Sequence, residues 1–339
     1  MSSLTKCTIA LFLAAVMPTV VAAQPSAGTA AAKPPFELFV TFGDSLADTG
    51  NVYVMSKAFG LTPAIPPSDS PNRTYFDGRF SNGRVAFEHL WDQLRGSNAP
   101  LQPFLRLKKI PRSGGVDFAF GGSTSGYYRS LDGFVVPGLR SQVELFLALH
   151  RGKLPAKSLF AIVTGSNDYL PQVPGEPPAD PVVVVRNIVS SVEMLYARGA
   201  RTIMVLNVAD LGALPLVSQA SQDQRNGLSW LSATHNMLLA TALTELAATR
   251  PSLELIAVDV NDVIAGLPAM NMTVPALEAI VTDWMFPFPV SACLFIDAST
   301  CPNVPTFNVG PGFFFWDAVH PTTTVHEGLA RYLAARLRD

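Results

Sequence analysis

The sequence predicts an α/β fold in which a parallel sheet is covered by helices on both faces. Five short segments are continuously apolar or β-branched, and stretches with helical spacing of apolar residues separate them. Uninterrupted apolar strands of this kind are typical of parallel sheets that are buried on both faces. The chain of 339 residues shows no internal repeat and no break in composition, so we expect one three-layer α/β/α domain over residues 36–339.

The predicted strands and helices alternate along the chain. The strands are expected at Leu38–Phe42, Val116–Phe120, Leu159–Thr164, Thr202–Leu206 and Leu253–Val258. Leu46–Phe59 is expected to be a helix or a helix plus a loop. Further helices are expected at Val85–Arg95, Ser141–His150, Val182–Ala197, Leu228–Thr249 and Val325–Arg338. The segment Tyr75–Gly83 mixes aromatic with turn residues, so we expect it to be a loop that folds back onto the domain.

The N-terminal residues have the features of an export signal. Lys6 supplies a positive charge, Cys7–Val21 is almost entirely apolar, and the residues up to Ala23 fit the small-residue cleavage rule. We therefore expect a signal peptide over residues 1–23, a flexible lead-in over 24–35, and a secreted or periplasmic protein. The alternative is an uncleaved anchor, although the apolar run is short for a membrane span and no second run of spanning length follows.

If the protein is exported, its remaining cysteines are expected to form a disulfide. Cys7 leaves with the signal, and Cys293 and Cys301 remain as a pair in an oxidising compartment. We expect a disulfide between them, with two buried free thiols as the alternative. Asn72 and Asn271 lie in glycosylation sequons, which matter only if the source is eukaryotic.

The charge and motif content excludes several classes of function. The formal net charge is −2 and there is no basic run, so we expect neither nucleic-acid binding nor a stable membrane anchor. The sequence contains no His-Glu-x-x-His motif, no cluster of cysteine ligands and no phosphate-binding loop. We therefore expect no metal and no organic cofactor. We also expect a monomer whose partner is a small molecule.

Ser45 is the candidate nucleophile. It follows the first predicted strand on the turn Gly43-Asp44-Ser45, and the carboxyl ends of parallel strands are where open α/β sheets bind ligands. A serine hydroxyl needs a general base and a third group that orients that base. Ala47 occupies the last position of what would be a Gly-x-Ser-x-Gly elbow, which argues against the ordinary α/β-hydrolase arrangement.

His320 is the candidate base and Asp317 the group that orients it. Pro321 biases His320 away from helical backbone, so its ring is presented from a loop, and Asp317 stands three residues earlier. The other histidines fall in predicted helices, where surface or packing roles are expected; they are His89, His150, His235 and His326.

Acyl transfer also requires hydrogen-bond donors for the negative charge that develops on the carbonyl oxygen. Three strand ends offer donors: the Ser45 N–H at a predicted helix start, the N–H groups of Gly121-Gly122, and the side-chain amide of Asn167. Glycine and asparagine are also ordinary turn residues. It is their combination with Ser45 at one edge of one sheet that indicates an active site.

Four blocks of the sequence resemble those of the GDSL, or SGNH, hydrolase family. The blocks are Phe42–Asn51, Phe118–Ser123, Gly165–Asp168 and Asp317–Pro321. The Tyr75–Gly83 segment looks like that of the lipolytic branch, which includes secreted bacterial phospholipases and acyltransferases and plant lipases. Ser123 departs from the alanine that is common in that branch.

The resemblance implies a flavodoxin-like fold with a central five-stranded parallel sheet, and no metal or organic cofactor. It assigns Ser45 as nucleophile, His320 as base and Asp317 as its orienting group. It also assigns an oxyanion hole made by Ser45, Gly122 and Asn167, with Gly121 as the fallback for Gly122.

These observations together predict a serine esterase or lipase that hydrolyses carboxylic esters through an acyl-enzyme on Ser45. A second hypothesis passes the acyl group to an alcohol, since the phenylalanines between Phe286 and Phe315 could line an acyl pocket, although they could equally be core. A third hypothesis is a carbohydrate acetylesterase, and a fourth is a secreted binding protein on an inactive scaffold.

Overall fold

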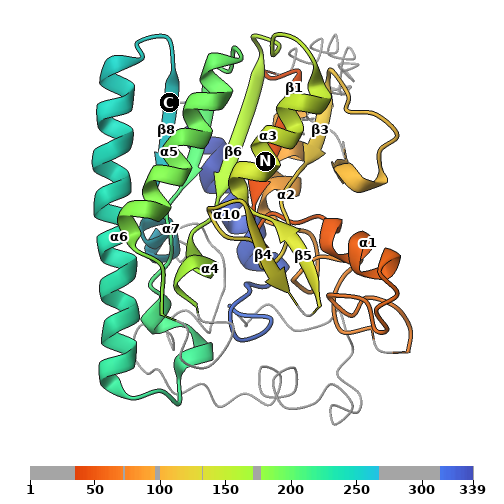
Figure 1. Ribbon diagram of the computed structural model, residues 1–339, viewed down its shortest axis with the longest axis vertical. Helices are drawn as coiled ribbons and strands as arrows, with labels where there is room; N and C mark the ends of the chain where they lie inside the picture. The colour runs from red at the N-terminus through yellow and green to blue at the C-terminus, as the bar shows by residue number, and fades with distance from the viewer. Residues whose placement is uncertain are drawn as a thin grey trace, which may run out of the picture. The chain divides into compact units, whose positions relative to one another are not determined.

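A six-stranded parallel sheet forms the centre of the structure, with strand order β2-β3-β1-β6-β7-β8 (Figure 1). The computed structural model describes residues 35–71, 73–95, 100–131, 133–170, 177–266 and 314–338. The strands of this sheet are β1 (Leu38–Gly43), β2 (Leu101–Pro103), β3 (Gly114–Asp117), β6 (Ser158–Val163), β7 (Thr202–Leu206) and β8 (Glu254–Val258). The predicted parallel α/β architecture is confirmed.

The sheet has one strand more than the five that the family resemblance implied. The additional strand is β2, which pairs with β3 at the edge of the sheet. It has only three residues and ends in Pro103, and a residue without an N–H is tolerated on an edge strand. A segment this short, bounded by proline, carries no recognisable strand pattern in the sequence.

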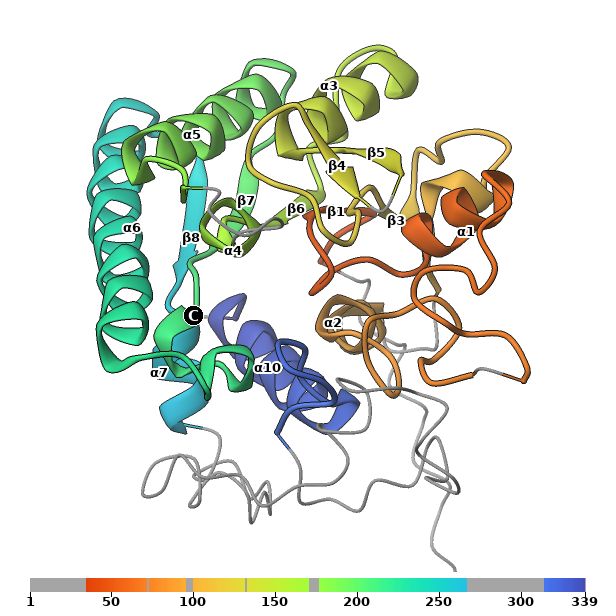
Figure 2. The same cartoon turned by 60° about the horizontal axis from the view of Figure 1, so that its bottom comes forward.

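Helices cover both faces of the sheet (Figure 2). One face carries α3 (Leu139–His150), α5 (Pro181–Ala197) and α6 (Gln222–Thr249), and the other carries α2 (Ala86–Arg95), α7 (Val260–Gly266) and α10 (Thr323–Arg336). The shorter elements are α1 (Asn51–Ala58), α4 (Ser166–Tyr169), the hairpin β4 (Tyr128–Leu131) and β5 (Phe134–Pro137), and 3-10 turns at Phe104–Arg106, Leu211–Ala213 and Pro215–Val217.

The alternation of side chains along β1 explains the two cores. Leu38, Val40 and Phe42 pack into the core under α3 and α5, whereas Phe39 points to the opposite core beside α2. Successive side chains of a strand point to opposite faces, so a continuously apolar strand supplies both layers at once.

The helix predicted directly after Ser45 begins only at Asn51. The carboxylate of Asp48 accepts the N–H groups of Gly50, Asn51 and Val52, and so satisfies the donors that a helix start leaves free. The expectation that Ser45 stands at a helix start was therefore wrong, and Ser45 lies instead in a single turn closed by Asp44.

Several predictions lie outside the described residues. They are the signal peptide at 1–23, the lead-in up to residue 34, the Cys293–Cys301 pair, both sequon asparagines, and the phenylalanines from Phe286 to Phe313. Within the described part of the chain, no helix has both the length and the apolar character that a membrane crossing requires.

Candidate active site

The candidate residues of the first three sequence blocks lie at the carboxyl edge of three neighbouring strands. Ser45 follows β1, Gly122 follows β3 and Asn167 follows β6, and β1 lies between the other two strands in the sheet. All three residues line one cavity. The order in which successive strands are added to the sheet reverses at β1. Open α/β sheets bind ligands in the crevice that forms at such a point.

A continuous hydrogen-bond chain joins Ser45, His320 and Asp317. The distance from Ser45 Oγ to His320 Nε2 is 2.8 Å, and that from His320 Nδ1 to Asp317 Oδ2 is 2.6 Å. The side chain of Asp317 is largely buried, and that of His320 is 14% exposed toward the cavity. This arrangement can move a proton from a serine hydroxyl to an imidazole whose second nitrogen is held by a carboxylate.

The carboxylate of Asp317 is stabilised in its ionised form. Its Oδ1 accepts the backbone N–H groups of Val319 at 2.9 Å and His320 at 2.8 Å, and its Oδ2 also accepts the hydroxyl of Tyr75 at 2.7 Å. Burial alone would raise the pKa of Asp317, but the charge of His320 and these hydrogen bonds lower it below its ordinary value. Asp317 is therefore ionised at neutral pH and can hold the imidazole of His320 in place.

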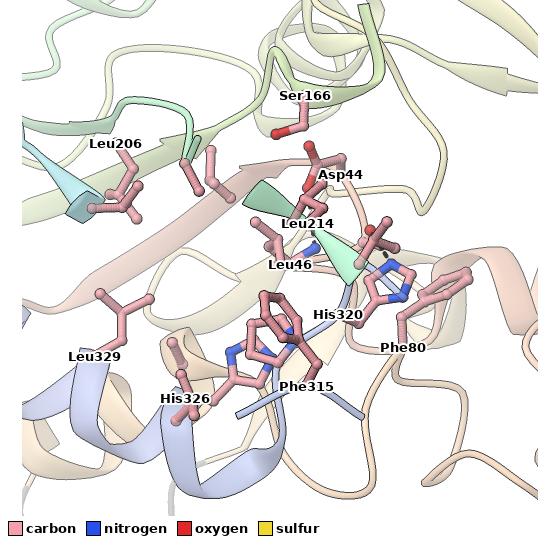
Figure 3. A pocket seen from close by; sticks show the side chains of 18 of the residues that line it. Asp44, Leu46, Phe80, Ser166, Leu206, Leu214, Phe315, His320, His326 and Leu329 are labelled. Atoms are coloured by element: carbon pink, nitrogen blue, oxygen red, sulfur yellow. Dashed lines mark hydrogen bonds between the residues drawn. The ribbon is translucent and has the colours of Figure 1, made fainter. Parts of the chain in front are cut away.

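The loop Tyr75–Gly83 folds back onto the domain, as predicted, and it contacts the domain at this site. Besides the Tyr75 hydroxyl, this loop supplies Phe80, whose ring centroid lies 5.2 Å from that of His320 (Figure 3). Ser81 Oγ donates to the carbonyl of Pro321 at 2.8 Å. The sequence argument missed the contacts of Tyr75 and Phe80 with Asp317 and His320, because the aromatic character of this loop indicated only that it packs against the domain.

Ser45 and Gly122 both line the cavity, and the backbone N–H groups of these two residues have no hydrogen-bond partner in the described part of the chain. The N–H of Gly121 is instead donated to Asp48 Oδ2 at 2.8 Å. A Cβ at Gly121 would lie 2.2 Å from the ring of Phe80, so close packing also explains the paired glycines. The geometry thus favours Gly122 over Gly121 as a donor to a ligand.

The side-chain amide of Asn167 is oriented by the neighbouring loop. Its Nδ2 donates to the carbonyl of Ser123 at 3.0 Å, which uses one of the two hydrogens of the amide. The second hydrogen remains for a group in the cavity that Asn167 lines.

Arg129, on the hairpin strand β4, ties the two donor loops together. Its guanidinium donates to the carbonyl oxygens of Gly122 at 3.3 Å, Asn167 at 2.8 Å and Leu170 at 3.1 Å. The sequence could not indicate this role of Arg129, because Asn167 and Leu170 are far from the hairpin in the chain and come close to it only in the folded structure.

Ser123, the departure from the family pattern, is buried and fully engaged. Its Oγ donates to the carbonyl of Gly43 at 2.7 Å and accepts from Gln142 Nε2 at 3.2 Å. The extra hydroxyl therefore links the loop after β3 to the end of β1, immediately before Ser45.

Two fully buried carboxylates support the turn that carries Ser45. Asp117 accepts the side-chain hydroxyls of Thr41 and Thr49 at 2.8 Å and 2.9 Å, while Asp48 accepts backbone N–H groups from both α1 and Gly121. Burial raises the pKa of both Asp48 and Asp117, since the two acids lie in the same dry region. This network connects the Ser45 turn to the glycine loop.

The cavity has a volume of about 380 Å³ and a mostly apolar wall, which also includes the polar side chains of Asp44, Ser166, His320 and His326 (Figure 3). Asp44, beside Ser45, is 1% exposed and its Oδ2 has no hydrogen-bond partner among the described residues; burial raises its pKa to about 7. The apolar wall is built mainly by Leu46, Phe80, Val163, Leu206, Leu211, Leu214, Val263, Ile264, Phe314, Phe315 and Leu329. A cavity of this kind fits an apolar ligand whose reactive end is polar.

None of the other four histidines bonds to Ser45. His89 lies 3.4 Å from Thr323 Oγ1, His235 Nδ1 lies 2.8 Å from the hydroxyl of Tyr169, and His150 is buried on α3. His326 also lines the cavity, which the sequence did not indicate. Among the residues that the structure describes, no three His, Cys, Asp or Glu side chains are grouped as a metal site.

Comparisons with known proteins cover most of the chain. The family model described as GDSL-like Lipase/Acylhydrolase matches residues 39–333. The phosphatidylcholine-sterol acyltransferase of Aeromonas hydrophila is 28% identical over 332 residues, which cover 88% of this chain and 89% of that protein. The secreted effector protein SseJ of Salmonella typhimurium is 26% identical, over 86% of this chain and 61% of its own length. A GDSL esterase/lipase of Arabidopsis thaliana is 30% identical, over 64% of this chain and 62% of its own length.

Proposed function

This chain belongs to the GDSL-like lipase/acylhydrolase family and is an ester-bond hydrolase, and from that premise we propose that Ser45 carries the acyl group of the substrate as a covalent acyl-enzyme. The single observation that carries the proposal is the hydrogen-bond chain from Ser45 through His320 to Asp317 at the polar end of an apolar cavity. The substrate is a carboxylic ester with an apolar acyl chain.

The proton moves along this chain in both halves of the reaction. His320 Nε2 takes the proton from Ser45 Oγ as the oxygen attacks the carbonyl carbon, and it returns that proton to the departing alcohol. Water then attacks the carbonyl carbon of the acyl-enzyme and gives a proton to His320. His320 returns this proton to Ser45 Oγ as the bond between Oγ and the acyl carbon breaks and the acid is released. Asp317 keeps the imidazole in the required tautomer and stabilises the imidazolium between these transfers.

The oxyanion of each tetrahedral intermediate is held by three donors. The free N–H groups of Ser45 and Gly122 and the second amide hydrogen of Asn167 supply them. Preorganised donors of this kind are worth about 10²–10³ in kcat each in a serine hydrolase, because they require no rearrangement as charge develops.

The test replaces Ser45 with alanine and measures hydrolysis of a short-chain nitrophenyl ester and labelling by a fluorophosphonate. Both signals should be lost in Ser45→Ala. A matched control is Ser191→Ala, since Ser191 is a buried serine of α5 that donates to Asn187 and does not line the cavity; it should keep both. Wild-type turnover by Ser45→Ala would contradict the proposal.

Acyl transfer to an alcohol is the second candidate, and the similarity to the Aeromonas acyltransferase over 88% of this chain favours it. Hydrolysis and transfer share the acyl-enzyme and differ only in whether water or an alcohol attacks it. Product analysis with phospholipid and a sterol or glycerol distinguishes them: formation of a new ester supports transfer, and free fatty acid alone excludes it. The apolar cavity wall makes an acetylated polysaccharide a poorer substrate.

We also infer that the protein is exported. The apolar run Cys7–Val21 with its small-residue site supports this inference, as does the similarity to a secreted effector. N-terminal sequencing of the mature protein should find Gln24 as the first residue. A mature chain that still begins at Met1 would contradict cleavage.

A further inference from the structure

His326 is a polar side chain in the wall of the cavity that the proposed chemistry leaves unused. It lies in the first turn of α10, is 2% exposed, and lines the same cavity as Ser45. Within the part of the chain that the structure describes, neither Nδ1 nor Nε2 has a hydrogen-bond partner. In Figure 3 it lies on the side of the cavity with Phe315 and Leu329, opposite Asp44 and Ser166. Buried side-chain polar atoms nearly always have a partner, so this ring lacks one that a ligand can supply.

The ring is neutral, which defines the ligand it can accept. Burial, with smaller contributions from His89 and His320, lowers the pKa of His326 to about 3. A neutral imidazole offers one N–H donor and one bare acceptor nitrogen. The nearby cavity residues Phe315, Val325 and Leu329 have apolar side chains and can meet neither need.

We propose that His326 selects esters whose acyl chain carries a hydroxyl group, by hydrogen-bonding that hydroxyl inside the cavity. The inference rests on the proposed acyl-enzyme at Ser45, because the covalently held acyl group is the part of the substrate that stays in the cavity. A hydroxyl can donate to the bare nitrogen or accept from the N–H, so it suits either tautomer. A charged group would lose its hydration beside these apolar walls, and a neutral ring supplies no opposite charge to compensate for that loss.

The preference for a hydroxylated acyl chain follows from the ring nitrogens of His326 that an unsubstituted chain leaves unpaired. An alkyl acyl group that fills the cavity keeps both ring nitrogens unpaired and shut off from water, whereas the hydroxylated chain pairs one of them. Sites built to bond a substrate hydroxyl discriminate strongly against the analogue that lacks it, for the same reason. The hydroxylated ester should therefore have the higher kcat/KM.

The experiment compares nitrophenyl octanoate with a set of hydroxyoctanoate esters that differ only in which carbon carries the hydroxyl. For the wild-type protein, at least one positional isomer should exceed octanoate by about tenfold in kcat/KM. In His326→Leu this preference should disappear, so that the ratio of kcat/KM for the preferred isomer to that for octanoate falls to about one, and His326→Gln should retain part of it.

The matched control is His150→Leu, because His150 is also a buried histidine whose ring nitrogens have no partner among the described residues, and it lies on α3 outside this cavity. It should keep the hydroxyl preference. Equal kcat/KM for octanoate and every isomer in the wild-type protein would overturn the inference, as would an unchanged preference in His326→Leu. Should His326→Leu not fold, the wild-type preference and His326→Gln decide. Failure of the wild-type protein to hydrolyse any ester or to react with a fluorophosphonate would instead overturn the acyl-enzyme at Ser45.

Discussion

Replacing Tyr75 with phenylalanine isolates the hydrogen bond that the folded-back loop gives to Asp317. The Tyr75 hydroxyl donates to Asp317 Oδ2 at 2.7 Å, and the same oxygen accepts from His320 Nδ1. The change removes one oxygen atom and leaves the ring in its edge-to-face contacts with Phe80 and Trp316. Any effect on activity therefore reports on the carboxylate rather than on packing.

The magnitude follows from the four hydrogen bonds that Asp317 accepts, of which three remain in Tyr75→Phe. A hydrogen bond to a charged, buried group contributes about 2 kcal/mol to the free energy of unfolding. For catalysis we expect a fall in kcat/KM of about tenfold, equivalent to about 1.4 kcal/mol, because the remaining bonds still hold the carboxylate near His320.

The stability change should depend on pH. The pKa of folded Asp317 is lowered from its ordinary 3.8, so the ionised carboxyl contributes stability above that value and loses it as the pH falls through the folded pKa. Tyr75→Phe removes one of the contacts that lower this pKa. The difference in unfolding free energy between wild type and variant should thus be full at neutral pH and shrink below about pH 4.

Urea unfolding at several pH values and hydrolysis of a short nitrophenyl ester measure the two effects. The matched control is Tyr53→Phe, since the Tyr53 hydroxyl also donates to a carboxylate, Asp69, which is half exposed and does not line the cavity. The control should leave kcat/KM unchanged. The reasoning is refuted if Tyr75→Phe retains wild-type kcat/KM, or if its stability loss is the same at acid and neutral pH.

Three further substitutions test how the donor loops are held. Arg129→Lys cannot reach the carbonyl oxygens of both Gly122 and Asn167, so ester hydrolysis should show a kcat about tenfold lower, with KM nearly unchanged; an unchanged kcat would contradict this. Ser123→Ala loses the bond to the Gly43 carbonyl and should lower the unfolding free energy by about 1 kcal/mol in urea titrations; equal midpoints would argue against it. Gly43→Ala places a Cβ 1.8 Å from the backbone carbonyl oxygen of Val163 in β6, at a φ of +139°. Thermal unfolding should therefore show an unfolding free energy that is lower by at least about 3 kcal/mol. A midpoint temperature equal to that of the wild type would contradict the clash.

The local sequence was sufficient to predict candidate catalytic residues that lie close together in the chain. Asp317 and His320 stand three residues apart before a proline, and the structure brings them within hydrogen-bond distance across one turn. The apolar strands likewise predicted the parallel sheet, because a continuous apolar run is a property of neighbouring residues alone. The edge strand β2 was not predicted, since its three residues end in proline and form no apolar run.

Contacts between distant segments could not be predicted in this way. Tyr75 reaches Asp317 across 242 residues, and Arg129 reaches Asn167 from a hairpin whose docking depends on the whole sheet. Nothing in the local sequence around Tyr75 distinguishes a hydroxyl that orients a carboxylate from one that faces water.

The sequence by itself determined the α/β class, the order of the strands along the chain, and the candidate residues Ser45, Asp317 and His320, because continuous apolar runs and short motifs are local properties. Only the tertiary structure decided that the N–H of Gly121 is bonded to Asp48 whereas that of Gly122 has no partner among the described residues, and that His326 lines the cavity with Ser45. The physical reason is that a hydrogen-bond partner or a cavity wall is defined by atoms close in space. Packing of the sheet and its helices brings such atoms together from segments that are far apart in the chain.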